Sequence, residues 1–91
     1  MSEVISRTVE IVNKRGLHAR ASAKFVTMAS GLAARVEVEK DGSCVVGTSI
    51  MGLMMLGAAM GDTVTISATG DGAEQAVAQL CALVENKFGE E

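Results

Sequence analysis

Residues 34–47 have the sequence ARVEVEKDGSCVVG, which predicts a β-hairpin at the centre of the fold. Ala34, Val36 and Val38 alternate with charged residues, as expected for a strand with one buried face. Asp41-Gly42 comes next, and this dipeptide is a strong short-range signal for a hairpin turn. Residues 44–47 then supply the partner strand.

Patterns of apolar residues predict two further strands and three helices around this hairpin. The expected strands cover Ser6 to Val12 and residues 63–68, and the expected helices cover residues 19–30, 50–56 and 73–84. The order is therefore β-α-β-β-α-β-α. It favours an α+β fold, an open-faced β/α sandwich with a four-stranded, mainly antiparallel sheet and three helices on one face.

Three local signals are expected to set the helix ends. Gly31 is the expected stop of the first helix. Ser49 is a candidate N-cap of the second helix. Asp71 and Glu74 resemble a capping box at the start of the third helix, with Asp in place of Ser or Thr.

Length and composition limit the class of protein. The 91 residues form one domain, 1–91, and the apolar content of 48% excludes a disordered chain. A net charge of −3 and an aromatic content of 2% argue against nucleic-acid binding, because that function needs a basic surface and stacking side chains. No signal peptide precedes the first strand, so we expect a cytoplasmic protein.

The cysteines and one uncharged stretch exclude other classes. Cys44 and Cys81 are predicted to be buried thiols in a reducing compartment, and with one histidine they provide too few ligands for zinc. Residues 42–61 lack charge over a length that could span a bilayer, but five glycines disfavour a helix there. We expect neither a metal nor membrane insertion.

His18 precedes a predicted helix and is the most informative single residue. The first N–H groups of a helix lack internal partners, and the helix dipole stabilises an anion beside them. The same field disfavours imidazolium, so a nucleophilic ring nitrogen is expected near pH 7.

Basic residues surround this histidine. Residues 14–24 contain four cations and no acid, and residues 1–24 carry a net +3 against −6 for the remainder. Such polarity suits a group that accepts a phosphoryl from one partner and yields it to another. The alternative is that His18 is a helix-start residue on a solvated basic face.

The sequence Gly16-Leu17-His18-Ala19-Arg20 resembles the active centre of HPr, the histidine phosphocarrier family of the bacterial phosphoenolpyruvate-dependent phosphotransferase system. The resemblance extends from about Ser6 to Val84. It includes Lys24-Phe25-Val26, TSIMGLMML at residues 48–56 and GDTVTI at residues 61–66.

The resemblance implies roles for several of these residues. His18 would accept a phosphoryl group on Nδ1 from phospho-enzyme I and give it to a IIA component, and Arg20 would pair with the phosphate. Ser49 matches the family's regulatory serine, the target of HPr kinase/phosphorylase. No cofactor is implied, because the phosphoryl group comes from phosphoenolpyruvate through enzyme I. We expect a covalent intermediate in a relay rather than a self-sufficient enzyme.

This chain departs from the family pattern after the arginine, where Ala21 replaces the usual proline. Because proline presets the first turn of a helix, we expect weaker preorganisation of His18 without loss of function. We also expect a phosphate on Ser49 to leave the fold intact and to weaken acceptance at His18.

The surface for partners is predicted around the second helix and the basic residues. Flexible methionines suit a surface that meets several partners in turn. The predicted contact residues are Leu17, Lys24, Ile50, Met51, Met54 and Met55. A chain that binds its partners alternately is expected to be a monomer.

Three functions remain open on this reading. The chain is a carrier that feeds sugar transporters, a carrier in a regulatory branch such as the nitrogen-related phosphotransferase system, or a binding-only domain switched through Ser49. The first two share the same chemistry and differ in the acceptor.

Overall fold

In a computed structural model of the chain, which describes residues 4–90, four strands form one antiparallel sheet. The strands are β1 (Val4–Glu10), β2 (Arg35–Lys40), β3 (Ser43–Val46) and β4 (Thr63–Thr69), in the spatial order β1-β4-β2-β3. The helices are α1 (Ala19–Ser30), α2 (Ile50–Met55) and α3 (Ala73–Glu85), followed by the short 3-10 helix η1 (Lys87–Gly89). The predicted fold class and element order are confirmed.

The hairpin forms where Asp41-Gly42 predicts it. Asp41 and Gly42 have φ values of 51° and 86°, the left-handed conformations that a tight two-residue turn between strands requires. The turn sets Lys40 opposite Ser43 and Val38 opposite Val45. Alternation along β2 then places Val36 and Val38 in the core.

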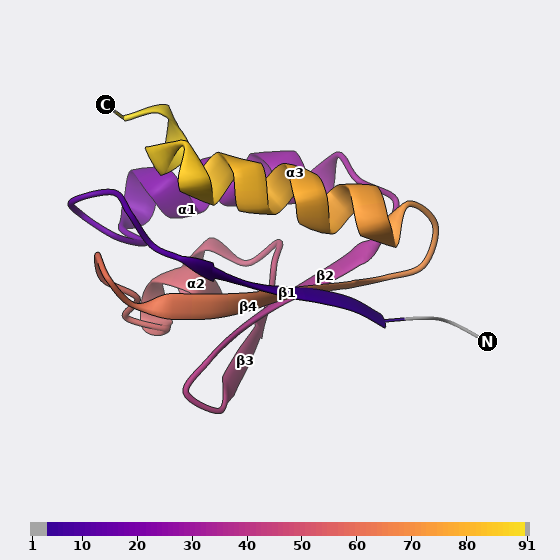
Figure 1. The fold of residues 1–91 in the computed structure, drawn as a ribbon, viewed down its shortest axis with the longest axis horizontal. Coiled ribbons are helices and arrows are strands. Elements are labelled where there is room, and N and C mark those ends of the chain that lie inside the picture. Colours follow the sequence, from indigo (N-terminus) through magenta and orange to yellow (C-terminus); the bar gives the residue numbers. More distant parts are fainter. Residues whose placement is uncertain (1–3, 91) are drawn as a thin grey trace.

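Helices α1 and α3 lie over one face of the sheet, as Figure 1 shows. Helix α2 packs against α1 and β3, and it contributes Leu53 and Leu56 to the same core. The opposite face of the sheet carries polar cross-strand pairs. Ser6 and Ser67 hydroxyls lie 3.0 Å apart, and those of Thr8 and Thr65 lie 3.1 Å apart. The sandwich is therefore open on one side.

Two predicted strand features need correction. The first strand is β1, Val4–Glu10, rather than Ser6 to Val12, because the chain leaves the ladder after Glu10. Cys44 is exposed, whereas Cys81 is buried as predicted. Cys44 lies on the edge strand β3 opposite Glu39 of β2, and alternation turns both residues away from the core.

The expected capping box at the third helix is also wrong. Gly72, with φ of 74°, occupies the N-cap of α3, and it provides no side-chain hydrogen bond. Gly70 also has a positive φ, so a tight turn places Asp71 one residue before the cap. Gly31 does end α1, in a right-handed conformation with φ of −84°.

Candidate functional site

Hydrogen bonds and one close backbone contact hold the loop between β1 and α1 in place just before His18. Asn13 is fully buried, and its Nδ2 donates to the carbonyl of Gly16 at 2.9 Å. Gly16 has φ of 63° and lies against Ala58, where an added Cβ would approach the carbonyl oxygen to 2.3 Å. Leu17 N–H donates to that same carbonyl at 2.9 Å. Only glycine satisfies both the conformation and the close approach.

His18 is the N-cap of α1. Its backbone is extended, with φ of −77° and ψ of −178°, and its carbonyl accepts the N–H of Ser22 at 2.9 Å. The ring atom Nδ1 accepts the N–H of Arg20 at 3.2 Å. A nitrogen that accepts a hydrogen bond carries no proton, so Nδ1 keeps its lone pair at the start of the helix.

The other ring nitrogen of His18 contacts the C-terminal end of the described chain. Nε2 lies within hydrogen-bonding distance of Glu90 Oε2, and Asn13 Nδ2 donates to Glu90 Oε1 at 3.0 Å. The side chains of His18 and Glu90 are 22% and 15% exposed. In Figure 1 the C-terminal segment, in yellow, and the loop that leads into α1 lie at the same end of the molecule.

These contacts change the charge of the carboxylate. Partial desolvation opposes ionisation, but the hydrogen bonds from Asn13 and His18 outweigh it, helped by the nearby positive charge of Lys24. The pKa of Glu90 is therefore lowered from its ordinary value of 4.5. Glu90 is an anion at neutral pH.

Four cations form the rim of the site. Lys14, Arg15, Arg20 and Lys24 line one hollow together with Gly89 and Glu90. Lys24 Nζ donates to the carbonyl of Phe88 at 2.8 Å, which attaches α1 to η1. The predicted phosphate partner Arg20 is exposed in the first turn of α1. Because Glu90 lines this hollow and also contacts His18, the cations lie next to the histidine and favour an anion there.

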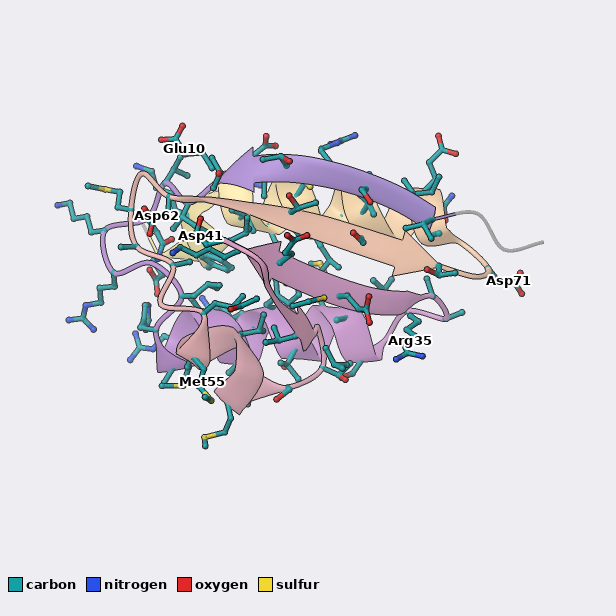
Figure 2. The ribbon with its side chains drawn as sticks, turned by 90° about the horizontal axis from the view of Figure 1, so that it is seen from below. Glu10, Arg35, Asp41, Met55, Asp62 and Asp71 are labelled. Atoms are coloured by element: carbon teal, nitrogen blue, oxygen red, sulfur yellow. The ribbon has the colours of Figure 1, made fainter. Side chains whose placement is uncertain are left out.

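Ser49 and α2 form a second feature of interest. Ser49 is the N-cap of α2, and its Oγ accepts the N–H of Gly52 at 3.0 Å, as the predicted cap requires. The predicted contact residues Ile50, Met51, Met54 and Met55 are exposed, with Met55 at 80%. Figure 2 shows Met55 projecting away from the body of the fold. Leu17 differs from them, because its side chain is buried in the core.

The comparisons with known proteins decide the family. A family model described as the PTS HPr component phosphorylation site matches residues 5–86. The chain belongs to the HPr family. It is a phosphocarrier of the phosphotransferase system, as the resemblance in the sequence implies.

Individual HPr-family relatives agree over nearly the full length. The phosphocarrier protein HPr of Cupriavidus necator is 44% identical, covering 96% of this chain and 98% of its own. A protein called phosphocarrier protein NPr, from Shewanella violacea, is 40% identical and covers 94% of each chain. The crystal structure of HPr-C-His from Thermoanaerobacter tengcongensis superimposes with a TM-score of 0.91 at 49% identity, covering 96% and 98% of the two chains.

Sequence reasoning missed three residues of this HPr-family site. Asn13, Phe88 and Glu90 shape the surroundings of His18, yet none belongs to a recognisable motif. Phe88 carries a weak signal, since it is one of two aromatic residues and lies beyond the last predicted helix. Glu90 lies 72 positions from His18, so only the fold brings the two together.

Both thiols of this HPr-family chain are less acidic than an ordinary cysteine. Partial desolvation and the nearby Glu37 and Glu39 raise the pKa of Cys44, and burial raises the pKa of Cys81. Less thiolate is therefore available at neutral pH. None of the helices within residues 4–90 is long and apolar enough to cross a bilayer.

Proposed function

We propose that His18 accepts a phosphoryl group on Nδ1 from phospho-enzyme I and passes it to a IIA component. The observation that carries the proposal is the geometry of Nδ1. This atom presents its lone pair at the start of α1, accepting the Arg20 N–H at 3.2 Å. The helix dipole stabilises an anion bound there. The Arg20 N–H, which now donates to Nδ1, can donate to that anion instead.

The transfer needs no cofactor held by this chain. The Nδ1 lone pair attacks phosphorus, the Nδ1–P bond forms, and the bond between phosphorus and the donor breaks. Arg20 pairs with the phosphoryl oxygens, because a guanidinium presents several donors to an oxyanion. Delivery to the IIA component is the same substitution with His18 as the leaving group.

The test uses the single histidine of the chain. Wild type and His18→Ala are incubated with enzyme I and phosphoenolpyruvate, and intact mass is read before and after mild acid. We expect one acid-labile phosphate on wild type and none on the variant. An acid-stable phosphate, or an equal mass gain in both proteins, would contradict phosphorylation at His18.

Ser49 is proposed as a regulatory site for HPr kinase/phosphorylase. A phosphate on its Oγ would place about two negative charges at the start of α2, beside the exposed apolar residues of that helix. We expect Ser49→Asp to fold and to accept phosphate from enzyme I more slowly. Thr48→Asp is the matched control, since Thr48 is exposed one residue earlier. Equal rates for wild type and Ser49→Asp would argue against this regulation.

The docking surface for enzyme I and the IIA component is proposed on α2 and the basic rim. It comprises the exposed residues Ile50, Met51, Met54, Met55 and Lys24, with Leu17 supporting the loop from beneath. Met51→Asp should raise the KM of enzyme I for this chain. Met60→Asp is the control, because Met60 is 57% exposed but lies outside α2. An unchanged KM for Met51→Asp would remove α2 from the surface.

The branch of the phosphotransferase system depends on the acceptor. Two branches remain candidates, sugar transport and the regulatory, nitrogen-related branch. The relatives include proteins called HPr and one called NPr, so both kinds of acceptor are tested. Purified phospho-carrier is offered to IIA proteins of both kinds, and the one that gains phosphate identifies the branch.

Size-exclusion chromatography tests the expected monomer in the same samples.

A further inference from the structure

The contact between Glu90 and His18 carries a consequence for the transfer step. We propose that Glu90 is a positioning residue that holds the Nε2–H of His18 and stabilises the positive charge that the ring gains during phosphorylation. This inference rests on the proposed function, since it assumes that Nδ1 is the acceptor. Its structural basis is a donor at one ring nitrogen and an acceptor at the other.

The two hydrogen bonds of the ring select one tautomer. Nδ1 accepts from the Arg20 N–H, so the proton of the neutral ring is on Nε2, where Glu90 accepts it. Together they fix the plane of the ring as well. The nucleophilic atom therefore faces the helix start, and the protonated atom faces the carboxylate.

Charge balance explains why a carboxylate is useful at this position. When Nδ1 of the Nε2–H tautomer forms a bond to phosphorus, the ring retains the Nε2 proton and becomes a cation. The donor takes the electron pair of the bond that breaks. An anion hydrogen-bonded to Nε2 stabilises this cation as it develops, and it stays clear of the phosphoryl group on the other nitrogen.

A second hydrogen bond holds the Glu90 carboxylate, and the residue two positions before it is anchored, which indicates a built position. Asn13 Nδ2, on a fully buried side chain, donates to Oε1. Two residues earlier, Phe88 is 1% exposed, and its carbonyl accepts the Lys24 ammonium. These contacts attach Phe88 and Glu90 to α1 and to the loop that carries His18.

The backbone before Glu90 adopts an unusual conformation to reach this position. Lys87 and Phe88 have φ values of 57° and 54°, and Gly89 has φ of 73°. The left-handed region is unfavourable for residues with a Cβ, so packing must hold this turn. The turn reverses the chain after α3 and directs it back to the start of α1.

Three variants separate the contact from general stability. Glu90→Ala removes the acceptor, Glu90→Gln keeps an acceptor oxygen without the charge, and Glu85→Gln removes an exposed carboxylate at the end of α3 as a control. We expect kcat for phosphorylation by enzyme I to fall about tenfold in Glu90→Ala, equal to ~1.4 kcal/mol. Glu90→Gln should lie between it and wild type, and KM should stay unchanged in all three.

A second measurement does not depend on phosphotransfer. His18 is the only histidine, so one set of ¹⁵N-labelled imidazole signals reports its ring. In wild type at neutral pH, the Nε2 proton should be visible and slow to exchange with solvent because Glu90 accepts it. The signal should be lost in Glu90→Ala and retained in Glu85→Gln.

The outcomes distinguish this inference from the proposed function. Phosphorylation of wild type with equal kcat in all variants would overturn the role of Glu90 and leave the carrier function in place. A rapidly exchanging Nε2 proton in wild type would overturn the contact itself. Failure of wild type to accept phosphate from a competent enzyme I would overturn the proposed function, and with it any part for Glu90 in transfer.

Discussion

Replacing Phe88 should reveal how strongly η1 is attached to the rest of the fold. Phe88 lies three residues after the end of α3 and is 1% exposed, and η1 contacts both α3 and α1. A buried phenylalanine changed to alanine typically costs about 3 to 5 kcal/mol. Because η1 is a single short turn that can relax around a smaller side chain, we expect a value near ~3 kcal/mol for Phe88→Ala.

The backbone at Phe88 reverses the usual order of stability between an alanine and a glycine variant. Loss of burial alone does not predict this reversal. Phe88 has φ of 54°, a conformation that costs a non-glycine residue roughly 1 to 2 kcal/mol. Phe88→Gly should therefore be at least as stable as Phe88→Ala. Phe25 is the control, because it is equally buried but lies within α1. There, glycine should be less stable than alanine by about 1 kcal/mol.

The assay is urea unfolding followed by far-ultraviolet circular dichroism, since the chain has no Trp or Tyr to serve as a fluorescent probe. A domain of this size is stable by about 5 to 14 kcal/mol, so each variant should remain folded in water. A loss below about 1 kcal/mol for Phe88→Ala would show that the ring is not part of the core. A glycine variant less stable than the alanine variant at position 88 would refute the left-handed turn.

Three further predictions concern the loop, the cap of α2 and pH. Gly16→Ala should be much less stable than Gly57→Ala in the same urea assay, because both glycines have positive φ but only at Gly16 would a Cβ meet Ala58 and Ala59; equal losses would contradict the close approach. Ser49→Ala should lower the free energy of unfolding by about 1 kcal/mol through loss of the hydrogen bond to Gly52 N–H, and an unchanged urea midpoint would show that this cap is not formed. Because the folded pKa of Glu90 lies below 4.5, its ionised form contributes stability above pH 4.5 that is lost as pH falls through the lower folded value. The difference in urea midpoint between wild type and Glu90→Gln should therefore shrink in acid, and a difference that grows below pH 4.5 would contradict the lowered pKa.

Elements with strong local signals were predictable from the sequence. Helix α1 covers the predicted residues 19–30, because the apolar spacing changes period there and Gly31 follows. The hairpin was predictable because Asp41-Gly42 tolerates the left-handed conformations that its turn requires. His18 was also identified as a helix-start residue from local sequence alone, and it is the N-cap.

Features that depend on tertiary position were not predictable in this way. Cys44 looks like a core residue in sequence, but its exposure follows from β3 being an edge strand whose alternation starts at the turn. The basic segment around His18 contains no acid in sequence, yet Glu90 enters the site from 72 positions away. No periodicity or local spacing encodes that contact, since it depends on a left-handed turn after α3 and on the burial of Phe88.

His18 and Ser49 share one physical arrangement, which bears on how phosphorylation at either would affect the fold. Each is an N-cap, and the capping atom is the one that would carry the phosphate, Nδ1 in one case and Oγ in the other. Neither α1 nor α2 has an acidic residue in its first turn, so no carboxylate of the helix itself competes with a phosphate for the dipole. A phosphoryl group would exchange a neutral acceptor for an anionic one beside the same backbone donors. Phosphorylation at either site should therefore change the charge that a partner meets while leaving the helix start intact.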